Sequence, residues 1–191
     1  AGSNTSVFSL TINVTLTAAA SLTNNVSVFG GGEAALNTGD NTASDPTTTI
    51  ALVPNVGLLK SCPLPADCTT APQLSGADLT YRIQFTNTGG HVASAMTIFD
   101  ANPLNTDFKV GTAQASVGTS GLIFAIEYSN NYSSANPALA TWTYVPVSAG
   151  GGAAAGYDRN VKAVRWRVTA GTLSNIAPNN TGSVSFMVKI R

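Results

Sequence analysis

The chain has 191 residues, a formal net charge of zero and only 9% charged residues, against about 25% in an average soluble protein. The balance leaves no basic footprint for nucleic acid, and the 43% of apolar residues, set in regular patterns, argues against a disordered chain. Thr, Ser, Asn and Gly fill the polar positions instead, as they do in extracellular, assembled β proteins.

The N-terminal stretch is free of charge, since no Asp, Glu, Lys or Arg occurs before Glu33. From residue 8 to residue 16 apolar and polar residues alternate, which predicts a long strand with one apolar face. An uncharged strand with an unpaired edge is an aggregation hazard, so we expect it to pair with something. Its apolar residues are Phe8, Leu10, Ile12, Val14 and Leu16.

Further strand patterns follow along the chain, separated by Gly- and Asn-rich turns. The clearest is 79–86, where Leu79, Tyr81, Ile83 and Phe85 alternate with polar residues. No segment has a convincing helical period. The pattern therefore predicts an all-β antiparallel sandwich of about ten strands. The expected strands are 8–16, 24–29, 47–53, 56–60, 79–86, 96–100, 121–128, 142–144, 164–168 and 184–190, with loops at 30–45, 101–107 and 148–158.

The two cysteines are Cys62 and Cys68, separated by a short segment with Pro63, Pro65 and Asp67. With one histidine in the chain, a zinc site would lack ligands. We therefore expect a disulfide, which implies an oxidising, extracellular or cell-surface location. The sequence has no apolar run long enough to span a membrane, and no metal or other cofactor is expected.

The stretch LTYRIQFTNTGGHVASAMTIFD resembles the repeat of prokaryotic surface proteins known as domain of unknown function eleven. The matching positions include Asp78, Tyr81, Asn87 and Asp100, and VGLLKS, GYDRNVKAVRWRV and GSVSFMVKI look like other strands of that repeat. The resemblance covers roughly Val56 to Arg191. It implies an immunoglobulin-like sandwich over residues 54–191 and does not point to a reaction.

The chain departs from the repeat in one respect, because segments that resemble its closing strands lie at the front, within residues 1–53. They either fold back on their own sandwich or complete a neighbouring copy by donor-strand complementation; the chain could also be one segment of a longer repeat protein. In the second arrangement the N-terminal strand is the donor. It would enter beside the last strand, whose apolar residues are Val184, Phe186, Val188 and Ile190.

The leading hypothesis is thus a structural subunit of an extracellular filament, a homopolymer built head-to-tail. The alternative is an adhesive or carbohydrate-binding module of a larger surface protein. No nucleophile motif accompanies His91, so we expect a turn residue and no enzyme. Charge is uneven, because acids alone occur before Lys60 and cations alone after Asp158, which would suit head-to-tail contact.

Several side chains are candidates for other chemistry. Oxygen ligands gather in one loop as calcium requires, although turn capping is the simpler interpretation; Glu127 stands alone in a strand and suggests no acid pair. Lys60 could form an isopeptide crosslink to Asn24, Asn25 or Asp78. Core packing is favoured over a sugar platform for the aromatic residues. The calcium candidates are Asp100, Asn102, Asn105 and Asp107; the aromatic residues are Trp142, Tyr144 and Trp166; and the candidate glycan acceptors in Asn-x-Ser/Thr sequons are Asn4, Asn13, Asn25, Asn131 and Asn179.

Overall fold

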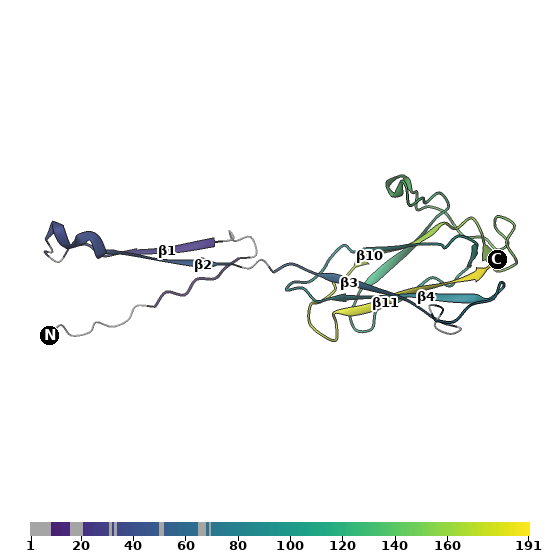
Figure 1. Cartoon of the computed structure of the whole chain (residues 1–191), viewed down its shortest axis with the longest axis horizontal. Helices are drawn as coiled ribbons and strands as arrows, with labels where there is room; N and C mark the ends of the chain where they lie inside the picture. Colours follow the sequence, from purple (N-terminus) through teal and green to yellow (C-terminus); the bar gives the residue numbers. More distant parts are fainter. Residues whose placement is uncertain are drawn as a thin grey trace. The chain divides into compact units, whose positions relative to one another are not determined.

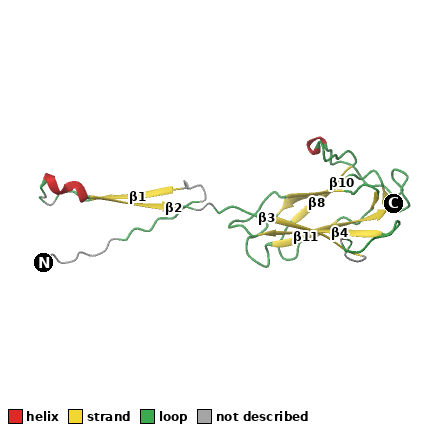
Figure 2. Cartoon of the chain, viewed as in Figure 1, coloured by secondary structure: helices red, strands yellow, loops and turns green. Residues whose placement is uncertain are grey.

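The computed structural model describes residues 9–15, 21–30, 32, 34–49, 52–64, 68 and 70–191. The chain divides into two compact units, Ala1–Leu52 and Val53–Arg191. Strands dominate the described residues, and the two helical segments are short 3-10 turns, η1 (Ala35–Asp40) and η2 (Pro137–Leu139) (Figure 2). The predicted all-β class is therefore confirmed.

The first unit contains one antiparallel hairpin (Figure 1). Strand β1 (Ser21–Ser27) pairs with β2 (Thr42–Thr48) in a register that sets Asn24 opposite Asp45. Their sequences, SLTNNVS and TASDPTT, have few apolar residues to alternate. The strands expected at 24–29 and 47–53 therefore begin three and five residues earlier in the structure. Pro46 fits β2 because each strand of a two-stranded sheet has one free edge.

The second unit is an antiparallel β-sandwich of the immunoglobulin-like class. One sheet has the order β3-β4-β11-β6-β9, with β7 also paired to β11, and the facing sheet has the order β5-β10-β8. Figure 1 shows β3, β4 and β11 side by side in the first of these sheets. The bounds are β3 (Val56–Leu64), β4 (Asp78–Asn87), β5 (Thr97–Ala101), β6 (Thr106–Lys109), β7 (Gln114–Ser116), β8 (Ile123–Ser129), β9 (Tyr157–Asp158), β10 (Ala163–Ala170) and β11 (Thr181–Ile190).

Alternation explains why these strands bury one face. In β4 the side chains of Leu79, Ile83 and Phe85 are buried, while Arg82 and Gln84 between them are exposed. Trp166 of β10 packs against Phe186 of β11, with ring centroids 6.1 Å apart, and joins the two sheets at their centres. These contacts form one continuous core, in which the side chains of Trp166 and Phe85 are fully buried.

Three strands were not predicted from the sequence, and one predicted strand is only a single β-bridge in the structure. The TDFK sequence of β6, in a stretch expected as a loop, has no apolar alternation, and β7 and β9 are only three and two residues long. The strand expected around Trp142 is a single bridge between Tyr144 and Tyr128 of β8. Strands this short are defined by their neighbours rather than by their own sequence.

Candidate functional site

The described part of the predicted donor strand is Ser9–Thr15, and it lies outside any strand. Its three apolar residues are largely exposed: Leu10 by 74%, Ile12 by 60% and Val14 by 53%. Phe8 and Leu16, the other two predicted donor residues, lie outside the described residues. A strand requires a hydrogen-bonded neighbour, so an extended N-terminal strand is not confirmed in the single chain, and its apolar face is uncovered.

The hairpin that follows has no core of its own. Among the described residues up to Leu52 none is buried, and Val26, Phe29 and Leu36 expose 61%, 91% and 97% of their surface. An isolated two-stranded sheet is marginally stable in water. The described residues of the first unit therefore lack the apolar burial that normally holds a domain together.

The predicted acceptor residues lie in β11, and all four point into or beside the core. The side chains of Val184, Phe186 and Val188 expose at most 1% of their surface, and Ile190 packs against this core. However, β11 is paired with β4 along one side, and on the other side with β7 at residues 183–185 and with β6 at residues 188–190. An incoming strand would have to displace one of these neighbours, so the expected docking beside β11 requires correction: it has no open edge.

Open strand edges occur elsewhere in the sandwich. β3 ends one sheet and β5 ends the other. The two edges are joined by an ion pair, in which Lys60 Nζ of β3 lies 2.8 Å from Oδ1 and 2.7 Å from Oδ2 of Asp100 in β5. Lys60 also lies over the ring of Tyr81, 4.7 Å from its centroid. Burial raises the pKa of Asp100, and Lys60 opposes that shift by hydrogen bonding and charge.

The residues considered as isopeptide partners of Lys60 were Asn24, Asn25 and Asp78. Asp78 is engaged elsewhere, because it accepts hydrogen bonds from Lys109 Nζ at 2.7 Å and from Tyr157 Oη at 2.8 Å. Asp78 is therefore not the partner of Lys60, which instead pairs with Asp100. Asn24 and Asn25 belong to β1 of the first unit.

The calcium prediction is not supported by the contacts of its acidic residues. The carboxylate of Asp107 is held by Arg159 at 2.9 and 3.1 Å and lies 3.6 Å from Arg191, while Asp100 is held by Lys60. Asn102 donates from its side chain to the carbonyl of Val161. Asn105 has a φ of 62°, as expected of a turn residue. Within the described part of the chain no cluster of three or more His, Cys, Asp or Glu side chains could hold a metal ion.

The cations near the end of the chain are mostly neutralised within the sandwich. Arg165 and Arg167 both bind Glu127, and Arg159 binds Asp107. These hydrogen bonds, from Arg167 first and then Arg165, lower the pKa of Glu127 against the opposing effect of burial. Because the cations are paired internally, they contribute less to contact with another molecule than the sequence suggests.

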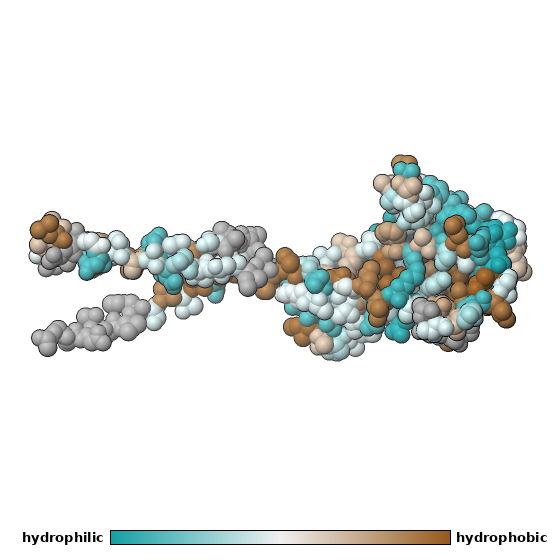
Figure 3. All heavy atoms as spheres, viewed as in Figure 1, coloured by the Kyte–Doolittle hydropathy of each residue, from teal (hydrophilic) through white to brown (hydrophobic). Residues whose placement is uncertain are grey.

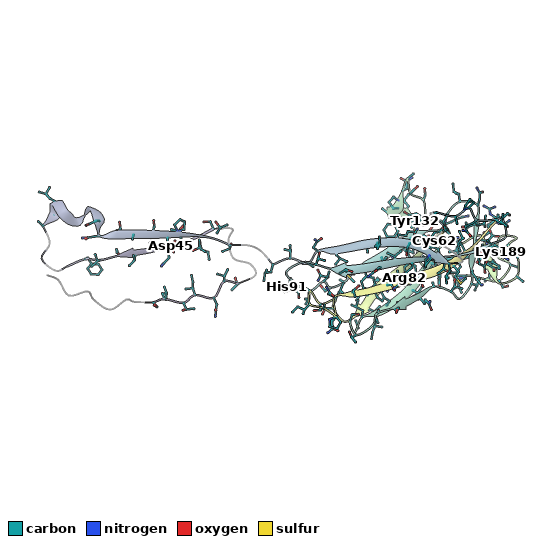
Figure 4. The ribbon with its side chains drawn as sticks, turned by 60° about the horizontal axis from the view of Figure 1, so that its bottom comes forward. Asp45, Cys62, Arg82, His91, Tyr132 and Lys189 are labelled. Atoms are coloured by element: carbon teal, nitrogen blue, oxygen red, sulfur yellow. A yellow bond between two sulfur atoms is a disulfide. The ribbon has the colours of Figure 1, made fainter. Side chains whose placement is uncertain are left out.

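His91 and the cysteines have structural surroundings. His91 lies in a bend at one end of the sandwich, with its Nδ1 3.2 Å from the Val92 carbonyl, and Lys189 lies at the other end (Figure 4). Cys62 and Cys68 are bonded, which confirms the predicted disulfide. Cys62 is buried near the end of β3, and the bond holds Cys68 against the core.

The predicted aromatic residues mainly pack. Trp166 is fully buried, Tyr144 donates from its hydroxyl to Asp158 at 2.8 Å, and Trp142 is covered by the guanidinium of Arg165, 4.5 Å from its ring centroid. Phe99, 51% exposed, and Tyr132 lie beside Trp142 on the outer face of the three-stranded sheet. This is a small satellite cluster under the loop between β8 and β9.

The sequon asparagines differ in whether their side chains are engaged. Asn13, Asn25, Asn131 and Asn179 are all exposed. Asn131, however, uses its side chain to hold its own loop: its Oδ1 accepts from the Thr141 amide at 2.9 Å, and its Nδ2 donates to the Leu139 carbonyl. Asn4 lies outside the described residues. Asn131 is thus the least suited of the described acceptors for a glycan.

One organising residue was not predicted. Asp158 is fully buried, and its carboxylate accepts hydrogen bonds from Tyr144, from the Val147 amide and from the Asn160 amide at 2.8, 2.8 and 2.9 Å. Gly150 passes so close that a Cβ there would overlap this carboxylate. The Gly-rich stretch expected to be a flexible loop is therefore anchored. The Gly-Tyr-Asp sequence before an alternating strand is the only signal that could have revealed it.

No protein-family model, curated protein or solved structure matches this chain. None of the helices that the structure describes is long and apolar enough to cross a membrane. Two features of the molecule bear on its function: an uncovered apolar segment near the N-terminus and a sandwich with open strand edges.

Proposed function

We propose that the protein is a non-enzymatic structural subunit of an extracellular filament, and that copies join head-to-tail by donor-strand complementation. The observation that carries the proposal is the exposed apolar face of Leu10, Ile12 and Val14 in an uncharged segment. Burying each such side chain stabilises an interface by roughly 1.5–3 kcal/mol before ordering costs. A second copy that covers this face would bury these side chains and so stabilise the contact between the two copies.

Three further features support the proposal. The first unit has no buried residue among those described, so it gains from a partner. The disulfide fits an oxidising compartment. The low charge, and the stretches that resemble a surface-protein repeat, are in keeping with an assembled extracellular protein. Because donor and acceptor lie on different parts of one chain, the contact is heterologous and continues into an open fibre.

The test compares three full-length variants by negative-stain microscopy and light scattering. Leu10→Asp and Ile12→Asp should abolish fibres, because each would bury an unpaired carboxylate at the interface. Thr11→Asp is the matched control, since Thr11 is exposed in the same segment but has the opposite parity, and this variant should still form fibres. Equal assembly by all three variants would contradict the donor role.

The alternative, an adhesive or carbohydrate-binding module, has one feature in its favour. Phe99, Tyr132 and Trp142 form an aromatic cluster on the outer face, with ring centroids 5.7–6.5 Å apart. The guanidinium of Arg165 lies over Trp142 and occupies a ring face that a sugar would stack on. A wild-type protein that stays monomeric and binds polysaccharide would favour this alternative over the filament.

A further inference from the structure

The two sheets of the sandwich are unequal. Six strands, β7 included, face a sheet of three, and β5 is an end strand of the smaller sheet. The ion pair between Lys60 and Asp100 shows that β5 lies close to β3, which is an edge strand of the larger sheet. The sandwich is therefore open along the side where β3 and β5 face each other.

The inner face of β3 is uncovered on this side. Leu58 lies directly opposite Phe85 of β4, so both side chains point to the same face of the sheet. Phe85 is fully buried, yet Leu58 exposes 60% of its surface. Figure 3 shows apolar residues at the surface of the sandwich, in brown, among polar ones. An inward-facing leucine left open indicates that the smaller sheet ends too early to cover it.

The backbone of β5 has a free edge. The amide of Val168 donates to the Met96 carbonyl at 2.9 Å, and the amide of Asn102 donates to the Lys162 carbonyl at 2.8 Å. In an antiparallel pair hydrogen-bonded residues alternate, so the even-numbered residues of β5 bond to β10. The amide and carbonyl of Thr97 and Phe99 consequently point away from β10, toward an edge with which no strand of the described residues pairs.

We propose that the N-terminal segment Ser9–Thr15 of a second copy adds to this edge of β5, as a fourth strand of the smaller sheet. This inference rests on the proposed filament function and names its acceptor. The apolar residues Leu10, Ile12 and Val14 share one parity and cover Leu58, while the polar residues between them face solvent. A seven-residue strand is about 23 Å long, enough to pair with all five residues of β5.

Charge also suits this occupant. The open side is bordered by Lys60 and Asp100, which form an ion pair with each other. Burying an additional charge beside them would be costly, and Ser9–Thr15 carries none. The hydroxyl and amide side chains of the donor stay on its solvent face, so docking buries none of them.

Two pairs of full-length variants test this acceptor. Leu58→Asp should abolish fibres, whereas Leu59→Asp should keep them, because Leu59 is similarly exposed, at 65%, but points to the outer face. Phe99→Pro should abolish fibres, because it removes the backbone amide that points to the free edge. Phe99→Ala loses the same ring contacts but keeps that amide, so this variant should still form fibres. Circular dichroism of each monomer checks that the fold is retained.

Mixing gives the decisive measurement. Leu58→Asp retains the donor and Leu10→Asp retains the acceptor, so each alone should be monomeric, and their mixture should form a one-to-one dimer by light scattering after gel filtration. A mixture that stays monomeric overturns the proposed acceptor. Fibres from Leu58→Asp, with none from Leu10→Asp, also overturn it but leave the filament function intact. A wild-type protein that forms no fibres contradicts the filament function itself.

Discussion

Replacing Asp158 tests a fully buried carboxylate of the sandwich that accepts three hydrogen bonds. In Asp158→Asn one oxygen can still accept from Tyr144 and Val147, but the new amide group then faces the amide of Asn160. A buried hydrogen bond to a charged group contributes about 1.5–3 kcal/mol, and a buried donor left unpaired costs about 1–3 kcal/mol. We expect the free energy of unfolding to fall by about 2–4 kcal/mol.

The assay is urea unfolding followed by tryptophan fluorescence. Both tryptophans lie in the sandwich, and Trp166 is fully buried, so the signal reports this unit. Tyr144→Phe removes one of the three donors and should cost about 1–2 kcal/mol. In the Asp158→Asn background it should cost less, because the acceptor is no longer charged. A change below about 1 kcal/mol for Asp158→Asn would refute the anchoring role of this carboxylate.

Two further predictions concern pH and packing. The folded state holds the pKa of Glu127 below its usual range, so the unfolded chain binds more protons, and the stability supplied by this group should be lost as the pH falls through the folded-state pKa. Urea midpoints of wild type and Glu127→Gln, measured from pH 7 to pH 3, should therefore converge at low pH; a constant difference would contradict this linkage. Gly182→Ala should lower stability by about 1–3 kcal/mol, because the added Cβ would overlap the buried ring of Phe85. Normal stability in the same urea assay would show that this ring can move aside.

The sequence predicted those strands whose own side chains alternate. The pattern of Leu79 to Phe85 identified β4 and its buried face, because one residue in two must face the core. It missed β6 and placed the strands of the hairpin β1–β2 three and five residues too late, because their pairing depends on neighbours distant in sequence. The same limit applies to the docking site, since β11 was chosen for its apolar residues although its edges are occupied.

Of the two sides of the proposed contact, only the donor segment can be read from the sequence, and its role stays a prediction. Leu10, Ile12 and Val14 are recognisable because an uncharged alternating segment is visible in one stretch of sequence. The acceptor depends on which strands end the two sheets, and therefore on pairing across the whole fold. Leu58 looks like an ordinary core residue until its neighbours are placed.

The position of β11 has a consequence for the order in which the protein can fold during synthesis. β11 lies between β4 and the strands β6 and β7, yet all three precede it in the chain. At about 5–20 residues per second, the ribosome would release β4 several seconds before its central partner exists. The N-terminal segment leaves the ribosome earlier still. In the proposed assembly, a nascent chain would therefore expose its donor segment before its own acceptor has formed, which favours delaying assembly until each chain is complete.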